Sequence, residues 1–235
     1  MLLVALATYN EIENLPSLAA AIHAQMPEAD VLVVDDDSPD GTGQWCDEQA
    51  AKSPWFSVIH RAGKLGLGSA SWAAMQAAID RGYDSLITLD ADWSHPPETL
   101  PGLAAASINA DVVVGSRYCP GGRVEGWPLS RRAVSAVMNV ATRIALGLPL
   151  RDASTAYRLY RVELLRQLDF SQLTATGYAY LEEIAWHLDK LGARFVEIPI
   201  TFVDRRAGAS KVSIGEAFGK AKVLARLAMR RCRRK

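Results

Sequence analysis

Two carboxylates one residue apart, Asp90 and Asp92, are the residues of this chain best suited to chemistry. They follow the apolar run Leu86–Leu89, which is typical of a buried strand. Because residues i and i+2 of an extended segment project to the same side, both carboxylates can aim at one point beyond the strand. Paired oxygen ligands suit Mg²⁺ or Mn²⁺ shared with a phosphate. Asp-x-Asp is also common in capped turns, so the other strand ends must decide between the two interpretations.

Polar clusters also follow the other predicted strands in the first half of the chain. The predicted strands are Leu2–Ala7, Val31–Val34, Phe56–His60, Leu86–Leu89 and Val112–Val114, with helical patterns between them. This alternation predicts a parallel sheet, in which ligands bind beyond the carboxyl ends of the strands. The clusters that follow these strands are Thr8–Glu11, Asp35–Asp37, Arg61 with Lys64, Asp90 with Asp92, and Gly115–Tyr118. Their shared edge predicts one acidic crevice for a metal, a sugar and phosphate groups.

Composition is that of a globular α/β protein. The chain has 235 residues, of which 49% are hydrophobic and 22% charged, enough for one domain with a sizeable core. Its three cysteines and four histidines are dispersed, which argues against a disulfide framework or a zinc site and favours a reducing compartment. No stretch approaches the ~20 apolar residues of a membrane span, and Met1–Ala7 is too short for a signal peptide. We expect a soluble or peripheral protein.

The formal net charge is zero, but the charges are unevenly distributed. Residues 217–235 carry eight basic residues and no acid, whereas residues 1–216 carry 18 basic and 26 acidic residues. The apolar residues predicted on one face of this last helix are Ile214, Ala217, Phe218, Ala221, Leu224, Ala225 and Ala228. A basic helix with an apolar face is typical of a segment that lies on a membrane surface. The alternative is a solvated basic helix end.

The second half of the chain predicts further elements without a repeat or a linker. A helix up to Leu146 is predicted, with the apolar face Val134, Val137, Met138, Ala141, Ile144 and Ala145. It is short and is interrupted by Arg143, so we expect this face to pack in the core or on the acceptor side. Residues 155–160 and 194–200 are predicted strands, residues 178–191 a helix and residues 119–127 a loop. The predicted organisation is a catalytic domain over 1–215 and a basic amphipathic helix over 216–235.

Several motifs stand in a characteristic order along the chain. They are Thr8–Glu11, Val34–Thr42, Lys64–Ser69, Asp90–Pro97, Gly115–Tyr118, Gly126–Arg131, Tyr157–Arg161, Val203–Arg205 and Gly208–Lys211. Together they resemble family 2 glycosyltransferases of the dolichol-phosphate (polyprenol-phosphate) mannosyltransferase group over residues 2–215. The resemblance implies a GT-A fold, a Rossmann-like and mostly parallel central sheet flanked by helices. It also implies inverting transfer of mannose from GDP-mannose to a polyprenyl (dolichyl) monophosphate, giving polyprenyl-phosphate-β-mannose.

The resemblance also assigns residues to the donor and acceptor sites. The implied donor residues are Ala7, Tyr9, Glu11, Val34, Asp36, Asp90, Ala91, Asp92, Arg117, Arg205 and Lys211. Asp90 and Asp92 are the implied ligands of Mg²⁺ or Mn²⁺, and Ser94 stands where many members have Gln. The implied acceptor-phosphate residues are Arg117, Arg131 and Ser135. The implied catalytic residues are Asp92, Arg117, Arg205 and Lys211.

The chemistry agrees with this assignment. A diphosphate leaving group requires charge neutralisation, which a divalent cation and arginine or lysine supply. The acceptor phosphate has a second pKa of about 6 and is already anionic, so no general base is needed. Alternative functions are transfer of glucose or N-acetylglucosamine to the same lipid, or transfer to a hydroxyl acceptor with Glu183 or an aspartate as base. A nucleotide-sugar binder without activity is a further alternative.

Other polar residues receive structural interpretations. Asp37 is predicted to form a turn, His95 to make structural hydrogen bonds and Arg132 to lie at the surface. Glu183 is predicted either to face the active site or to be a solvated helix charge. We expect GDP-mannose, a polyprenyl phosphate and a membrane surface as partners, leave open a separate membrane-anchoring subunit, and expect no nucleic acid. The expected location is the cytoplasmic face of a membrane, as a peripheral protein.

Overall fold

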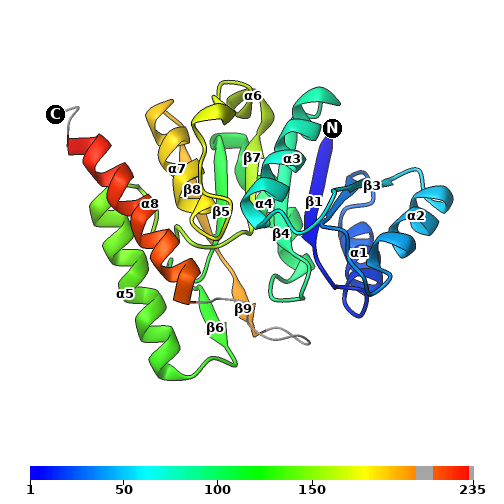
Figure 1. The fold of residues 1–235 in the computed structure, drawn as a ribbon, viewed down its shortest axis with the longest axis horizontal. Coiled ribbons are helices and arrows are strands. Elements are labelled where there is room, and N and C mark those ends of the chain that lie inside the picture. Colours follow the sequence, from blue (N-terminus) through cyan, green and yellow to red (C-terminus); the bar gives the residue numbers. More distant parts are fainter. Residues whose placement is uncertain (205–213, 233–235) are drawn as a thin grey trace.

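The protein is built around a seven-stranded sheet with strand order β3-β2-β1-β4-β7-β5-β8 (Figure 1). The structure is a computed structural model that describes residues 1–204 and 214–232, so Arg205 and Lys211 of the predicted site lie outside the described residues. The strands are β1 (Leu2–Thr8), β2 (Asp30–Asp35), β3 (Phe56–His60), β4 (Ser85–Asp90), β5 (Val112–Ser116), β7 (Arg158–Arg161) and β8 (Phe195–Pro199). Strand β7 is antiparallel to both of its neighbours, and the other pairs are parallel.

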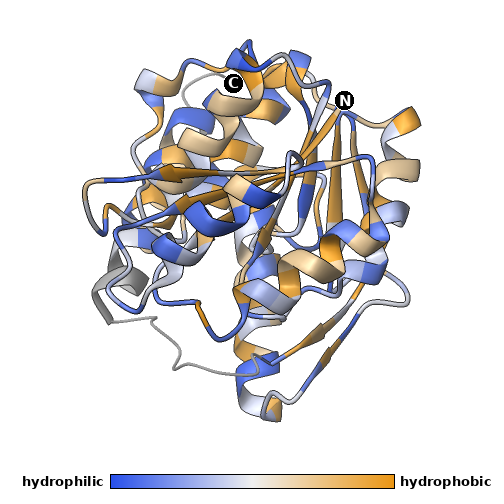
Figure 2. Cartoon of the chain, turned by 90° about the vertical axis from the view of Figure 1, so that its right-hand side faces the viewer, coloured by the Kyte–Doolittle hydropathy of each residue, from blue (hydrophilic) through white to orange (hydrophobic). Residues whose placement is uncertain are grey.

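Helices cover both faces of the sheet, so the central strands are apolar on both sides (Figure 2). Leu3 and Leu32 face one core, whereas Val4 and Val31 face the other. The helices on the first face include α3 (Leu67–Asp80), α6 (Val162–Leu165) and α7 (Tyr180–Lys190). Those on the second are α1 (Leu15–Gln25), α2 (Thr42–Lys52) and α4 (Leu100–Ala106). Each such side chain contributes about 1.5–3 kcal/mol when it is fully buried, which explains the near-continuous apolar strands.

The predicted parallel strands of the first half are confirmed, and their carboxyl ends share one edge of the sheet. The predicted strand at 155–160 forms as β7, which inserts between β4 and β5. The predicted loop at 119–127 contains a short strand, β6 (Arg123–Glu125), which pairs with β9 (Thr201–Val203). The remaining short elements are the 3₁₀ turns η1 (Pro97–Thr99), η2 (Ser107–Asn109) and η3 (Phe170–Gln172).

Helix α5 (Leu129–Leu146) turns its apolar face outward, so the first of the two placements expected for this face, in the core, is wrong, and packing on the acceptor side stays a prediction. The exposed residues, which we call the α5 apolar face, are Val134, Val137, Met138, Val140 and Ile144. The opposite, buried face carries Asn139 and Thr142. Asn139 can be buried because its Oδ1 accepts a hydrogen bond of 2.9 Å from the Ala153 backbone N–H. Helical periodicity defines a face but does not determine the direction in which that face points.

Helix α8 (Ile214–Cys232) lies beside α5 at one end of the molecule (Figure 1). Leu227 is fully buried, and Leu224 and Ala228 pack against the same core, whereas Lys222 is exposed. Of the apolar face predicted to lie on a membrane, Leu224 and Ala228 pack inward and Ala221 and Ala225 are exposed, so the membrane contact of this helix stays a prediction. The helix also runs through the boundary predicted between residues 215 and 216. Over the described ranges, no helix combines the length and apolar character needed to cross a bilayer.

Candidate active site

A cavity of about 220 Å³ opens at the carboxyl ends of β1, β2 and β4, and we call it the strand-end cavity. The predicted donor residues that line it are Ala7, Tyr9, Glu11, Asp36, Asp90, Ala91 and Asp92. They converge because β1 lies between β2 and β4 and all three strands are parallel. Val34 does not line the cavity, since its side chain is wholly buried in the core one residue before the end of β2.

The acidic corner after β4 is held by a tight turn. Asp90 ends the strand, and Trp93 adopts a left-handed φ of 64°, a conformation that costs about 1–3 kcal/mol for a residue other than glycine. The Asp92 carboxylate accepts a hydrogen bond of 3.1 Å from the Ser94 backbone N–H, which stabilises the turn. The turn leaves both carboxylates on the wall of the strand-end cavity. Local strain of this kind is typical of functional sites.

His95 supports this corner as a neutral side chain. It is buried, and its Nδ1 accepts a hydrogen bond of 3.1 Å from the Asp90 backbone N–H. Burial lowers the pKa of His95 to about 4, with the charge of Asp92 opposing the shift. The 3.8 Å approach of Nδ1 to the Asp90 carboxylate is therefore no ion pair at neutral pH. The structural role predicted for His95 is what this geometry supports.

The acidic corner fits a divalent cation. Asp90 and Asp92 supply carboxylate oxygens, and Ser94 places on the same turn a buried hydroxyl that has no hydrogen-bond partner among the described residues. Oxygen donors of this kind match Mg²⁺ or Mn²⁺. Across residues 1–204 and 214–232 there is no group of three or more His, Cys, Asp or Glu side chains that could hold a metal. A cation here would therefore take further ligands from phosphate and water, as Mg²⁺ commonly does.

Asp36 forms a second acidic wall of the strand-end cavity. Its carboxylate lies 3.0 Å from the Arg61 guanidinium and accepts a hydrogen bond of 3.1 Å from the Leu65 backbone N–H. Burial raises the pKa of Asp36, and the charge of Arg61 opposes that shift. Its neighbour Asp35 has a structural role, since it accepts hydrogen bonds from Thr8 and Ser38. Asp36 thus lines the cavity, whereas Asp35 holds the turn after β2.

Asp37 is the third aspartate of this cluster, and its exposed side chain and φ of 57° agree with the turn-forming interpretation. Aspartate tolerates this left-handed conformation better than most residues.

The strand-end cavity is also lined by residues that the resemblance did not assign to a site, among them Lys64, Gly177 and Tyr178. Lys64 places its ammonium 4.4 Å from the centre of the Tyr9 ring, a cation–π contact at the cavity mouth. Its position after β3 was a signal for this role. Gly177 and Tyr178 form another wall, and their place in a late loop carried no such signal.

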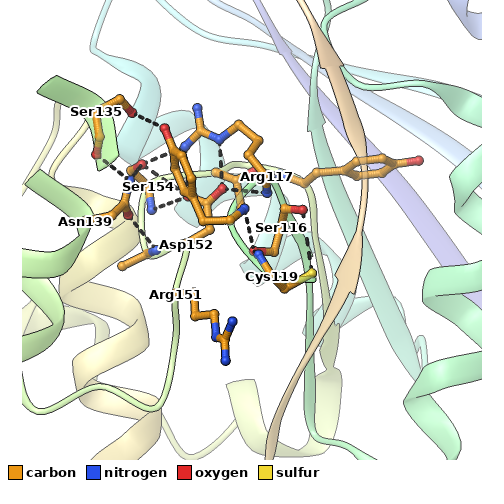
Figure 3. Close-up of polar contacts among 12 residues, drawn as sticks. Ser116, Arg117, Cys119, Ser135, Asn139, Arg151, Asp152 and Ser154 are labelled. Atoms are coloured by element: carbon orange, nitrogen blue, oxygen red, sulfur yellow. Dashed lines mark hydrogen bonds and ion pairs between the residues drawn. The ribbon is translucent and has the colours of Figure 1, made fainter. Parts of the chain in front are cut away.

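A second polar cluster, the Arg117 cluster, lies on the loops after β5 and α5 (Figure 3). The Arg117 guanidinium donates to both oxygens of Asp152, at 2.7 and 2.8 Å, and to Ser154 at 2.8 Å. Burial alone would raise the pKa of Asp152, but the hydrogen bonds and charge of Arg117 outweigh it and hold that pKa below its ordinary value. Arg117 is thus a paired, buried cation and does not line the strand-end cavity.

The other predicted acceptor residues lie next to Arg117. Ser135 accepts a hydrogen bond of 2.7 Å from the Tyr118 hydroxyl. Arg131 lies over the Trp127 ring at 4.0 Å, and its Nη1 is 3.5 Å from the Asp204 carboxylate. Neither Arg131 nor Ser135 lines the strand-end cavity. Arg132 is exposed, as predicted.

The Arg117 cluster and the strand-end cavity adjoin through Phe202. This ring lies 5.5 Å from the His95 ring and 5.3 Å from the Arg117 guanidinium. Burial lowers the pKa of Arg117, but Asp152 and, more weakly, the charge of Asp90 raise it overall, so Asp90 acts across this distance. Phe202 thus contacts both the Arg117 cluster and His95, which supports the acidic corner.

Residues 3–169 match the family model described as glycosyl transferase family 2. The chain belongs to glycosyl transferase family 2. It is 47% identical over 218 residues to an undecaprenyl-phosphate mannosyltransferase of Micrococcus luteus, covering 92% of this chain and 90% of the relative. It is 43% identical over 213 residues to a polyprenol monophosphomannose synthase of Mycolicibacterium smegmatis, covering 90% of this chain and 80% of the relative. The resemblance predicted from the ordered motifs is confirmed.

Solved structures place this family 2 member in the GT-A fold. A mycobacterial protein superposes with a TM-score of 0.69 at 20% identity, covering 98% of this chain and 74% of that one. A mannosyltransferase from Pyrobaculum calidifontis, solved in complex with GDP-Man and Mn²⁺, superposes with a TM-score of 0.63 at 18% identity, covering 100% of this chain and 64% of that one. At such identities the likeness concerns the fold alone, and the predicted GT-A fold is confirmed.

Proposed function

We propose that this glycosyltransferase moves mannose from GDP-mannose to the phosphate of a polyprenyl monophosphate, with inversion, to give polyprenyl-phosphate-β-mannose. The observation that carries the proposal is the 47% identity to an undecaprenyl-phosphate mannosyltransferase over 90% of that protein. The cavity supports it, because two acidic walls stand at the edge where parallel sheets bind nucleotides. We place the donor in the strand-end cavity.

Within the donor site, we assign the nucleoside to the side formed by β1 and β2, where Tyr9, Glu11 and Asp36 lie. The Arg61 ion pair holds Asp36 in place, so its carboxylate can accept hydrogen bonds from a sugar hydroxyl or a base without reorienting. Asp90 and Asp92 lie where the diphosphate would extend. Lys64 at the mouth adds a cation beside that diphosphate.

We further propose that activity depends on Mg²⁺ or Mn²⁺, held by Asp90 and Asp92 with the Ser94 hydroxyl nearby. Such a cation would neutralise the charge that develops on the departing diphosphate. The chain itself positions the two carboxylates: the turn at Trp93 fixes them, and the neutral His95 keeps that turn in place. Burial lowers the pKa of His95, which makes its neutral imidazole a weak base.

On the acceptor side, we assign the lipid phosphate to Arg131 and Ser135, with Arg117 beneath them. Arg131 is partly exposed, with a side-chain exposure of 40%, so an incoming phosphate can reach it. Arg117 is already neutralised by Asp152, so in this proposal it orients the loop and Tyr118 rather than supplying an unpaired charge. Arg205 and Lys211, outside the described residues, remain the proposed cations at the reacting phosphates.

The acceptor lipid needs a membrane surface, and we propose that the α5 apolar face provides the contact. Arg131 and Ser135 lie near the start of this helix, so a lipid chain that lies along the α5 apolar face would lead to the proposed phosphate site. Arg132 and Arg143 are exposed on the same helix, and basic side chains beside an apolar face suit an anionic bilayer. Cys46 and Cys119 are free and buried, which is consistent with the proposed location on a cytoplasmic membrane face.

The test is incubation with GDP-mannose, Mg²⁺ or Mn²⁺ and a short polyprenyl phosphate, with the product identified by mass. Parallel reactions with UDP-glucose and UDP-N-acetylglucosamine decide between donor sugars. A polyprenol without phosphate tests the hydroxyl-acceptor alternative, which would also show a rate that falls through an acidic pKa. Nucleotide binding without any product would instead support a non-catalytic binder.

A further inference from the structure

Glu183 of α7 is neither a solvated helix charge nor part of the cavity wall, which corrects both interpretations from the sequence. It is fully buried. One carboxylate oxygen accepts hydrogen bonds from the backbone N–H groups of Thr174 and Ala175, at 2.9 and 2.8 Å. The other oxygen accepts from the Arg226 guanidinium of α8 at 2.5 Å and from the Thr174 hydroxyl at 3.1 Å. Glu183 therefore joins the last helix to the segment 174–178.

The segment 174–178 reaches the strand-end cavity directly. The Thr176 carbonyl accepts a hydrogen bond of 2.8 Å from the Gly68 backbone N–H. A Cβ atom at Gly68 would lie 2.4 Å from the Ala175 carbonyl oxygen, so only glycine allows this approach. Gly177 and Tyr178 of the same segment line the cavity. The position of this wall thus depends on what holds Thr174 and Ala175.

We propose that Glu183 and Arg226 are positioning residues that couple the docking of α8 to the shape of the donor cavity. The inference uses the strand-end cavity as the donor site and in that respect rests on the proposed function. Arg226 fixes Glu183, and Glu183 fixes the backbone behind the wall formed by Gly177 and Tyr178. Removal of the guanidinium frees that wall and weakens nucleotide binding without touching the nucleotide.

The chain offers a matched control one residue away. Glu182 is also fully buried on α7 and pairs with Lys220 of α8, at 2.5 Å. Among the described residues, no hydrogen bond joins Glu182 to the segment 174–178. The Lys220–Glu182 pair therefore docks the same two helices without holding the wall.

Two measurements on the full chain test the coupling in Arg226→Met and Lys220→Met. Without ligand, hydrogen–deuterium exchange of the amides of Thr174, Ala175 and Gly68 should become faster in Arg226→Met and stay unchanged in Lys220→Met. The dissociation constant for GDP should rise about fivefold in Arg226→Met alone, within the range of couplings through packed networks. Arg226→Lys, which keeps the charge, should recover most of the lost exchange protection.

Equal changes in Arg226→Met and Lys220→Met, or no change in either, would overturn the coupling, because the effect would then follow helix docking alone. If Arg226→Met fails to fold, Arg226→Gln and Lys220→Met decide the matter by the same exchange measurement, with faster exchange expected only in Arg226→Gln, where the charged contact to Glu183 is lost. A wild-type protein that binds no GDP would refute the proposed donor, whereas the exchange data would still decide whether α8 holds the wall.

Discussion

The strand-end cavity and the Arg117 cluster hold their charges in different ways. Asp90 and Asp92 lie together at the end of one strand, and both carboxylates line the strand-end cavity. Arg117 and Asp152 instead form a buried, doubly hydrogen-bonded ion pair between two distant loops. The cavity thus presents its carboxylates on a wall, whereas the cluster pairs its charges with one another in the interior.

We therefore expect the acidic residues of the strand-end cavity to matter for activity and the Arg117–Asp152 pair to matter for folding. Two like charges on one cavity wall repel each other, so the removal of one of them should affect activity more than folding. A buried ion pair has the reverse property, because loss of one partner leaves an uncompensated charge in the interior. The predictions below test that contrast, from the largest expected effect to the smallest.

The largest effect is expected for Asp92→Asn, which keeps the shape of the side chain but removes its charge. We expect transfer to fall by about 1,000-fold or more, since a charge that stabilises a leaving group contributes several kcal/mol. Thermal unfolding should change little. Asp37→Asn, the same substitution at an exposed turn residue, is the control and should keep its activity. Near-normal turnover by Asp92→Asn, measured with labelled donor, would refute the metal proposal.

Asp152→Asn should affect the stability of the fold more than the activity. The loss of a buried partner of Arg117 is expected to lower the free energy of unfolding by about 3–5 kcal/mol. Asp111→Asn is the control, because Asp111 pairs with Arg194, whose side chain is 62% exposed, and we expect a loss of under about 1 kcal/mol there. Urea denaturation measures both. Equal losses in the two variants would show that burial of the pair is not what matters.

The same pair predicts a pH dependence. Because the pKa of Asp152 is lowered on folding, its contribution is fully present above the unfolded pKa of about 3.9 and is lost as pH falls through the lower folded pKa. The difference in unfolding free energy between wild type and Asp152→Asn should therefore be constant above about pH 5 and shrink below about pH 4. A difference that shrinks near neutral pH would point to another group.

A substitution on the α5 apolar face should have an effect of intermediate size, on membrane binding. Val137→Glu should weaken binding to vesicles of anionic lipid by about tenfold, because burial of an apolar side chain in the membrane interface is lost and a like charge is introduced. Folding should be unaffected at this exposed position. Ile108→Glu is the control on a distant turn, and Met229→Glu tests the exposed side of α8. Vesicle binding that responds to Met229→Glu but not to Val137→Glu would move the membrane contact to α8.

The smallest effect is expected for Lys64→Met at the mouth of the strand-end cavity. Loss of an exposed cation–π contact of about 0.5–1 kcal/mol should raise the dissociation constant for GDP about two- to fivefold. Lys52→Met, which removes an exposed lysine of α2, should leave that constant unchanged. If both variants weaken binding alike, Lys64 acts only through general charge.

Much of the strand-end cavity could be predicted from local patterns. Mostly apolar runs of three to six residues followed by polar clusters identified the strands, and parallel pairing then placed Tyr9, Asp36, Asp90 and Asp92 at one edge. Two residues assigned to the donor do not line the cavity, because strand alternation buries Val34 in the core and Arg117 pairs with Asp152. Gly177 and Tyr178 were missed because a distant loop carries them to the cavity.

Helices α5 and α8 show where local patterns fail. Both are amphipathic, and periodicity identified an apolar stripe on each, yet the stripe of α5 faces outward, whereas Leu224 and Ala228 of the α8 stripe pack inward. The direction depends on the partner surface: Asn139 finds backbone partners on the loop at Ala153, and Leu227 finds an apolar core.

Short-range order thus accounts for the acidic corner, because Asp90, Asp92, Ser94 and the turn between them lie within five residues. Long-range packing accounts for the remainder. Arg117 meets Asp152 across 35 positions, and Arg226 meets Glu183 across 43. No local pattern encodes such pairings, because they exist only once the sheet and its helices have brought the two charges out of water and into contact.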